Sequence, residues 1–262
     1  MSEVKVNENM RLEEGNHLGL CRAIHEPNSF CLLPKAFSVS GPLPEWQGVK
    51  AYFLATPALG ASFIECKLSI AAGGGTKEPL RLPCENYMYV LDGSVELVIA
   101  GKKHILEPKG FFWAPPSAEF SVKNRGADEA TLLWVRKKYK PTKFEPVPDI
   151  LVSSVSDIPA VQTNAERIQE CLPESNLGYD MAINIMTFDP GVSFPCTEIH
   201  VFEHGEYFLN GRGHLWVNGR YLEVTQDDFC YIAAFAPHFV VAYGPEPLSY
   251  MLFKDLSRDY EL

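Results

Sequence analysis

Four side chains in the C-terminal part of the chain could bind one metal ion. Glu198 and His200 stand two residues apart, His204 follows four residues later, and His238 lies further along. Imidazole and carboxylate groups are common ligands of divalent metal ions. On a strand, Glu198 and His200 would share one face about 7 Å apart, whereas His204 would lie about 13 Å further on. We therefore expect the chain to turn between His200 and His204 if all of them bind one ion.

The same segment also spells H-x-x-E-H, which on a helix would be an inverted zinc-protease motif. A helix would place His200 and His204 on one face, with Glu203 beside them as a general base. The β-branched and aromatic residues at 201, 202, 207 and 208 favour a strand instead, and Gly205 follows at once. The sequence thus favours a metal site on strands over a helical protease site.

The chain contains an internal repeat with an offset of 118 residues. ENYMYVLDGSVELVIAG (85–101) aligns without a gap to EHGEYFLNGRGHLWVNG (203–219). Matched pairs are Gly73 with Gly191, Tyr89 with Tyr207, Gly93 with Gly211, and Gly101 with Gly219. Glycines at fixed offsets indicate turns that need a positive φ or lack space for a Cβ. Alternating apolar residues between these turns predict that each copy is a small all-β barrel or sandwich.

The candidate ligands belong to the second copy only. Subtracting 118 from their numbers gives Leu80, Leu82, Asn86 and Phe120 in the first copy. None of these four is a usual ligand of transition metals. A single His is ordinarily a core or surface residue, but three His and a Glu at one place in the repeat favour a metal site.

Four segments follow from this pattern: an N-terminal arm (1–48), a first barrel without a metal site (49–140), a linker (141–180) and a second barrel with the metal site (181–262). Five prolines between positions 141 and 173 indicate an extended linker. The stretch AERIQECL (165–172) is the best candidate for a short helix.

Composition narrows the class of protein. The 262 residues include 23 basic and 33 acidic ones, a net charge of −10 that disfavours nucleic-acid binding. No apolar run approaches the ~20 residues of a membrane-spanning helix, and the polar N-terminal stretch has no signal-peptide core. Seven Cys without a C-x-x-C pair indicate reduced thiols.

We therefore expect a cytoplasmic protein, and we expect a homo-oligomer because exposed sheet edges are normally covered.

The ligand spacing resembles the metal motif of the cupin family, G-x5-H-x-H-x3,4-E-x6-G, in which a later His completes the site. Here Gly191, Glu198, His200, His204 and Gly211 follow that outline, with Glu and His exchanged. The E-x-H-x3-H signature in TEIHVFEHGEYFLNGRGHLWVNGRYLEV, with SYMLFKDLSRD at 249–259, is similar to the (S)-ureidoglycine aminohydrolases. These are bicupins of purine (allantoin) breakdown. The resemblance implies an all-β fold of two tandem cupin (jelly-roll) barrels.

The resemblance also implies a set of functional residues. The family binds Mn²⁺ through Glu, two His and a Gln, and these positions fall on Glu198, His200, His204 and His238. His238 departs from the family Gln, which also touches substrate, so the exact substrate is left open. Mn, Fe and Zn all accept such a ligand set. The substrate-contacting Tyr and Lys of the family fall on Tyr250 and Lys254.

The implied reaction is hydrolysis of a linear amidine or ureido C–N bond, releasing ammonia from (S)-ureidoglycine to give (S)-ureidoglycolate. Lys254 would hold the substrate carboxylate, Tyr250 would donate a hydrogen bond, and Glu198 would both bind metal and carry a proton, so that Glu198 and Lys254 are the candidate catalytic residues. The alternatives are another metal-dependent cupin, such as an iron dioxygenase or a sugar isomerase, and a non-catalytic bicupin.

Three nearby polar residues receive a structural interpretation. Cys196 is expected to be a buried, unreactive thiol. His214 is expected to lie at the surface or to pack against neighbours. Glu203 has a counterpart in Glu85 of the first copy, which favours a structural role over a catalytic one.

Overall fold

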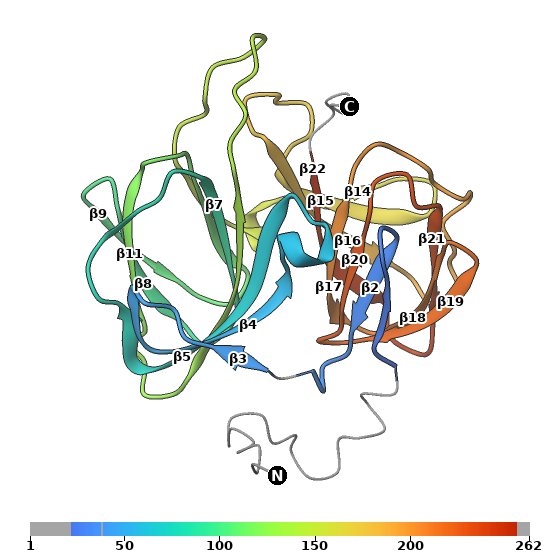
Figure 1. The fold of residues 1–262 in the computed structure, drawn as a ribbon, viewed down its shortest axis with the longest axis horizontal. Coiled ribbons are helices and arrows are strands. Elements are labelled where there is room, and N and C mark those ends of the chain that lie inside the picture. The colour runs from blue at the N-terminus through green and yellow to red at the C-terminus, as the bar shows by residue number, and fades with distance from the viewer. Residues whose placement is uncertain (1–21, 38, 256–262) are drawn as a thin grey trace, which may run out of the picture.

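The computed structural model describes residues 22–37 and 39–255, and in these ranges the chain is built almost entirely of strands. Two barrels of curled sheet lie side by side (Figure 1). The helices within the described ranges are two short 3-10 turns, η2 (Pro57–Leu59) and η3 (Val155–Asp157). None of them has the length and apolar character needed to cross a membrane. The all-β architecture of two tandem barrels is confirmed.

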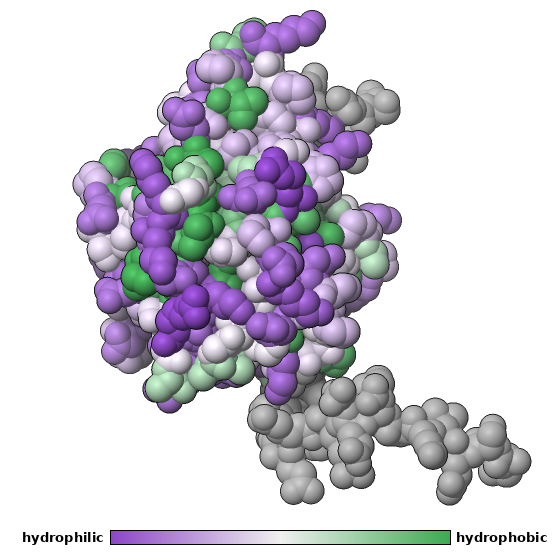
Figure 2. All heavy atoms as spheres, turned by 90° about the vertical axis from the view of Figure 1, so that its left-hand side faces the viewer, coloured by the Kyte–Doolittle hydropathy of each residue, from purple (hydrophilic) through white to green (hydrophobic). Residues whose placement is uncertain are grey.

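The first barrel is formed by one eleven-stranded sheet. Its strands are β3 (Ser40–Gly41), β4 (Trp46–Ala55), β5 (Phe63–Thr76), β6 (Leu80–Arg81), β7 (Glu85–Asp92), β8 (Val95–Ile99), β9 (Lys102–Leu106), β10 (Gly110–Ala114), β11 (Glu119–Lys123), β12 (Ala130–Lys137) and β13 (Leu151–Ser154). Hydrophilic side chains cover much of the face shown in Figure 2, with hydrophobic ones scattered between them.

The second barrel is formed by an eight-stranded and a three-stranded sheet. Its strands are β1 (Ile24–Glu26), β2 (Phe30–Leu33), β14 (Val161–Gln162), β15 (Glu166–Leu172), β16 (Met181–Phe188), β17 (His204–Asn210), β18 (Arg212–Val217), β19 (Arg220–Thr225), β20 (Phe229–Ile232), β21 (His238–Tyr243) and β22 (Leu248–Asp255). The predicted offset holds strand by strand: β12 and β22 begin 118 residues apart, and so do β9 and β19.

Segments outside the repeat complete the barrels by pairing at long range. In the N-terminal part, β2 pairs antiparallel with β20 of the second barrel, and β1 pairs with β2. In the segment between the copies, β13 pairs with β10 of the first barrel, whereas β15 pairs with β16 of the second. Residues 1–21 of the proposed arm lie outside the described residues.

The short helix predicted at residues 165–172 is wrong. This stretch is strand β15 from Glu166 on, which forms an antiparallel ladder with β16 whose register shifts between Glu170 and Leu172. Its residues have fair helix propensity, but propensity is a weak term that tertiary pairing overrides. The edge of β16 offers β15 a set of backbone hydrogen bonds, and Ile168 packs against the core of the second barrel.

Three apolar clusters hold the molecule together. One fills the first barrel, one fills the second, and the third lies between them. In the third cluster Phe63 of β5 stacks on Phe253 of β22, with ring centroids 3.8 Å apart. The barrels therefore share an apolar interface, and the strands that carry the candidate ligands are fixed against it.

Candidate metal centre

The three candidate histidines come from two places at one end of the second barrel. His204 is the first residue of β17 and His238 is the first residue of β21. His200 lies in the connection before β17, and the chain bends at Val201. A two-residue bridge holds this connection to β21, because Glu198 and His238 exchange backbone hydrogen bonds of 2.8 and 3.0 Å. No helix is present here, so the helical H-x-x-E-H interpretation does not apply.

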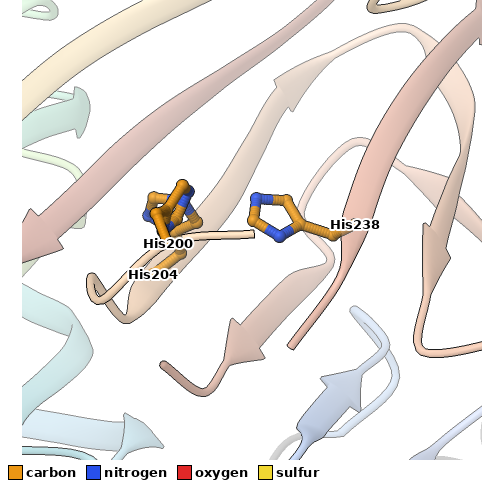
Figure 3. A group of neighbouring side chains, drawn as sticks. All are labelled: His200, His204 and His238. Atoms are coloured by element: carbon orange, nitrogen blue, oxygen red, sulfur yellow. The ribbon is translucent and has the colours of Figure 1, made fainter. Parts of the chain in front are cut away.

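The imidazole rings of His200, His204 and His238 point toward one another (Figure 3). Their ring centroids are 4.8, 5.0 and 5.0 Å apart, and each pair of rings is close to perpendicular. The Nε2 atoms of His200 and His204 lie 3.1 Å apart. One ring nitrogen from each residue falls within 4.8 Å of the others. Such a group of nitrogens can hold a single cation.

Hydrogen bonds from two of the rings fix which nitrogen faces the centre. The Nδ1 atom of His238 lies 2.9 Å from the carbonyl oxygen of Ala236, and that of His200 lies 3.2 Å from the carbonyl oxygen of Phe202. An Nδ1–H that donates to a carbonyl leaves the Nε2 lone pair free for a metal. The geometry thus fits a metal-binding imidazole cluster.

The charge state of the rings also fits a cation. Burial lowers the pKa of all three imidazoles, that of His238 to about 4 and that of His204 well below its usual value. The neighbouring His238 and His200 lower the pKa of His204 further. Neutral imidazole is the form that binds metal, so at neutral pH the cluster offers three lone pairs and no positive charge.

Glu198 lies beside the cluster. Its Oε2 atom is 3.8 Å from Nε2 of His238. Burial raises the pKa of Glu198, and the nearby Lys254 opposes that shift. The structure therefore brings three imidazoles together, with one carboxylate next to them. This set suits a divalent ion such as Mn²⁺, Fe²⁺ or Zn²⁺.

The cluster opens into a cavity of about 260 Å³ inside the second barrel. Tyr250 and Lys254 line it together with all four candidate ligands. Tyr250 is buried, and burial raises its pKa well above the usual value, so its hydroxyl stays protonated and able to donate. Lys254 forms an ion pair with Glu174, and its Nζ atom lies 5.1 Å from the centre of the Phe202 ring.

A second cavity, of about 670 Å³, lies between the barrels and contains none of the candidate ligands. Equivalent residues of the two copies line it, including Tyr89 with Tyr207 and Leu91 with Leu209. It lies where the two copies face one another. Its lining offers no imidazole, so we place the chemistry in the smaller cavity.

The structure decides the roles of the other polar candidates. Glu203 accepts hydrogen bonds from the backbone N–H of Ser62 and from the Tyr231 hydroxyl, both at 2.9 Å, which is a structural role at the interface between the barrels. His214 is exposed and packs on a tyrosine ring, as expected for a surface residue. The prediction for Cys196 is wrong, because this thiol is exposed in the loop before the bridge.

Four polar residues of the cavity wall were missed from the sequence: Glu166, Glu174, Asn184 and Glu206. A signal was present for Glu206. It stands two residues after His204, so on a strand it must point to the same side as that candidate ligand. Burial raises the pKa of Glu206 to about 8. No comparable signal marks Asn184, which sits in an apolar stretch of β16.

The fold and site together define a bicupin with a candidate metal centre in its second barrel. The cupin domain model matches residues 68–136 and 184–254. An (S)-ureidoglycine aminohydrolase of Escherichia coli (strain K12) is 28% identical over 246 residues, covering 92% of this chain and 94% of that protein. A rice protein (Oryza sativa subsp. japonica) named "Probable (S)-ureidoglycine aminohydrolase" is 30% identical, with 92% of this chain and 77% of that protein covered. The chain belongs to the (S)-ureidoglycine aminohydrolase family of cupins.

Solved structures agree with this assignment. The crystal structure of protein Ylba from E. coli superposes with a TM-score of 0.84 at 27% identity, covering 94% of this chain and 98% of that one. The likeness therefore extends over both barrels.

Proposed function

We propose that the protein is a Mn²⁺-dependent hydrolase that converts (S)-ureidoglycine and water to (S)-ureidoglycolate and ammonia, in purine (allantoin) degradation. The observation that carries this proposal is the convergence of three neutral imidazoles in a cavity that also holds Glu198, Tyr250 and Lys254. Relatives named for this reaction align over 92% of the chain. In the reaction a water oxygen bonds to the carbon that carries the amine, and the C–N bond breaks.

His200, His204, His238 and Glu198 are the proposed metal ligands. A divalent ion held by them would polarise the substrate and lower the pKa of a bound water. The hydrogen bonds from His200 and His238 to backbone carbonyls keep the rings oriented toward the centre.

The remaining residues of the cavity position the substrate. Lys254 supplies a positive charge for the substrate carboxylate. Tyr250 donates a hydrogen bond to the ureido group from a hydroxyl that stays protonated. Glu198, whose pKa is raised by burial, lies where it can carry a proton to the departing amine. His238 contacts the substrate from the position of the family Gln.

His238 also supports a second candidate function. Three imidazoles and a carboxylate form a ligand set that suits iron as well as manganese. A dioxygenase or a sugar isomerase would use the same centre on another substrate. A non-catalytic bicupin would contain less than one metal ion per chain after growth in Mn²⁺-supplemented medium.

The test combines elemental analysis with an ammonia assay on freshly generated ureidoglycine. We expect one Mn²⁺ per chain and ammonia release by the wild type. His204→Ala should lose both, whereas His214→Ala, which removes an exposed imidazole outside the cavity, should keep both. Circular dichroism of each variant checks that the fold is intact. Oxygen uptake on another substrate without ammonia release would refute the hydrolase, and turnover by His204→Ala would remove His204 from the site.

We also propose that the protein is cytoplasmic and assembles into a homo-oligomer. Open sheet edges such as β14 support assembly, because unpaired strand edges are normally covered. Light scattering after size-exclusion chromatography gives the number of subunits, and a monomer at micromolar concentration would contradict the assembly.

A further inference from the structure

Three residues on adjacent strands form one row across the wall of the metal cavity, which we call the floor row. Leu252 of β22 pairs with Glu206 of β17 on one side and with Asn184 of β16 on the other. Directly paired residues of antiparallel strands point to the same face, and all three line the cavity. The next pair of β17 and β22 on the same face is His204 with Lys254, about 7 Å away along the strands.

The two polar members of the floor row have acceptor atoms without partners. Glu206 and Asn184 are each 3% exposed. The Nδ2 atom of Asn184 donates to Glu174 at 3.2 Å, so the Oδ1 atom of the same side chain points away from Glu174. Neither Oδ1 of Asn184 nor Oε2 of Glu206 has a hydrogen-bond partner in the structure. Buried acceptors are normally satisfied because leaving one unpaired is costly. Two of them in one row of a cavity wall indicate a ligand that brings donors.

The lining of the cavity favours a donor group at the floor row. Three glutamate side chains besides Glu206 line it, from Glu166, Glu174 and Glu198. Among the described lining residues, Lys254 alone carries a permanent positive charge, and it is already paired with Glu174. Lys254 and the ion that the imidazole cluster would hold both lie on the side of His204, about 7 Å along the strands from the floor row. The floor row itself presents acceptor atoms without partners. A group with several N–H donors, such as an ammonium, is therefore favoured there over an anionic group.

The first barrel shows that the fold does not require this polarity. The equivalents of Glu206, Leu252 and Asn184 are Met88, Trp134 and Cys66, which pair in the same way across β7, β12 and β5. All three are at most 2% exposed, and they belong to the apolar core of that barrel. The polar floor row is thus a feature of the barrel with the metal centre.

We propose that Glu206 and Asn184 form a subsite that binds a primary ammonium group of the substrate beside the metal centre. The substrate class is a small zwitterion whose carboxylate lies toward Lys254 and whose ammonium lies on the floor row. Identifying that ammonium with the nitrogen that leaves ureidoglycine rests on the proposed function.

L-Asparagine and succinamate are matched probes for this subsite. They share an amide and a carboxylate and differ only in the α-ammonium, and asparagine has the shape of ureidoglycine with CH₂ in place of one NH. Isothermal titration of the Mn²⁺-loaded protein should show asparagine binding about tenfold more tightly than succinamate, as expected for a charge-assisted hydrogen bond. Glu206→Leu should abolish this preference and the isosteric Glu206→Gln should reduce it, with metal content unchanged.

Glu65→Gln is the matched control, because Glu65 is another buried carboxyl without a partner but lies outside the cavity. It should keep the preference for asparagine. Equal binding of the two probes by the wild type, no binding of either, or a full preference in Glu206→Gln and Glu206→Leu would overturn the proposal.

Ammonia release from ureidoglycine is measured on the same preparations. A preference for asparagine without ammonia release would refute the proposed reaction and support the subsite. Ammonia release without the preference would support the reaction and refute the subsite.

Discussion

Replacing Glu65 with glutamine should make the stability of the protein less dependent on pH. Glu65 of β5 lies at the interface between the barrels with 0% of its surface exposed. Neither of its carboxyl oxygens has a hydrogen-bond partner. Burial alone raises its pKa from 4.5 to about 8. The folded protein therefore keeps the Glu65 proton at neutral pH, whereas the unfolded chain releases it.

The sign and size of the effect follow from this difference in protonation. Between pH 4.5 and pH 8 the folded state binds more protons than the unfolded state. As far as Glu65 is concerned, the free energy of unfolding is therefore highest below pH 4.5 and falls as the pH rises toward 8. The slope approaches ~1.4 kcal/mol per pH unit for one group, which gives roughly 3–4 kcal/mol between pH 5 and pH 8. Glutamine has nearly the same shape and no proton to lose, so Glu65→Gln lacks this slope.

Urea unfolding of the metal-free protein at pH 5, 6, 7 and 8 measures the effect. The two proteins should be about equally stable at pH 5, and Glu65→Gln should be several kcal/mol more stable at pH 8. Glu85 and Glu206, whose pKa values are also raised to about 8 by burial, are present in both proteins and cancel in the difference. The exposed Glu107→Gln serves as control and should change stability by less than ~0.5 kcal/mol. Parallel pH profiles of wild type and Glu65→Gln would refute the reasoning.

Three further predictions concern the interface and the site. Lys137→Met removes an ammonium 2.7 Å from Asp180, a carboxylate only 1% exposed, and should cost ~3–5 kcal/mol in urea unfolding; a loss below ~1 kcal/mol would contradict this. Glu174→Gln should free Lys254 and lower the KM for ureidoglycine about fivefold in steady-state assays, with kcat unchanged; a higher KM would show that Glu174 assists binding. Gly205→Ala would place a Cβ 2.6 Å from a carboxylate oxygen of the first barrel and should lower stability by ~1–3 kcal/mol in thermal unfolding; an unchanged Tm would mean that the interface yields without cost.

Much of the fold could be predicted because glycines mark the repeat, and steric constraints require glycine at these positions. Gly93 and Gly211 have φ values of 73° and 77°, a region that other residues rarely adopt. A Cβ on Gly211 would also lie 2.3 Å from the carbonyl oxygen of Pro247. These turns have the same place in both copies, so the matching glycines revealed the repeat in the sequence.

The pairing of segments outside the repeat could not be predicted in the same way. β2 joins β20 across about 200 residues, and β13 joins the barrel that precedes it. Such pairs depend on which sheet edge is open in the folded molecule, and local patterns of hydrophobicity carry no record of that. Residues 165–172 show the same difficulty, because a stretch with fair helix propensity becomes a strand once the edge of β16 is available.

The candidate metal ligands could be predicted from the sequence because their residue types and spacing identify them. Residues that matter because they are buried in the cavity wall could not be predicted in this way. The spacing of His200 and His204, with a turn between them, follows from strand geometry and the reach of one ion. Asn184 becomes noticeable only when its strand partners are known, because a polar residue in a strand is usually turned to solvent. Glu206 could have been noticed from its spacing to His204, but its burial could not. Their burial without partners is a property of the closed barrel.

One of the differences between the two copies is a change of side-chain size in the wall of the barrel. In the first barrel Trp134 occupies the place that Leu252 takes in the second, and its indole N–H donates to Asn86 at 3.2 Å. Trp46 packs on the same indole, with ring centroids 5.4 Å apart. Asn86 stands at the position of His204. Its side-chain oxygen accepts the hydrogen bond from Trp134, so it is satisfied within the first barrel. The smaller Leu252 leaves room above the floor row for a substrate, and the filled first barrel supplies the rigid interface against which the hollow one keeps its shape.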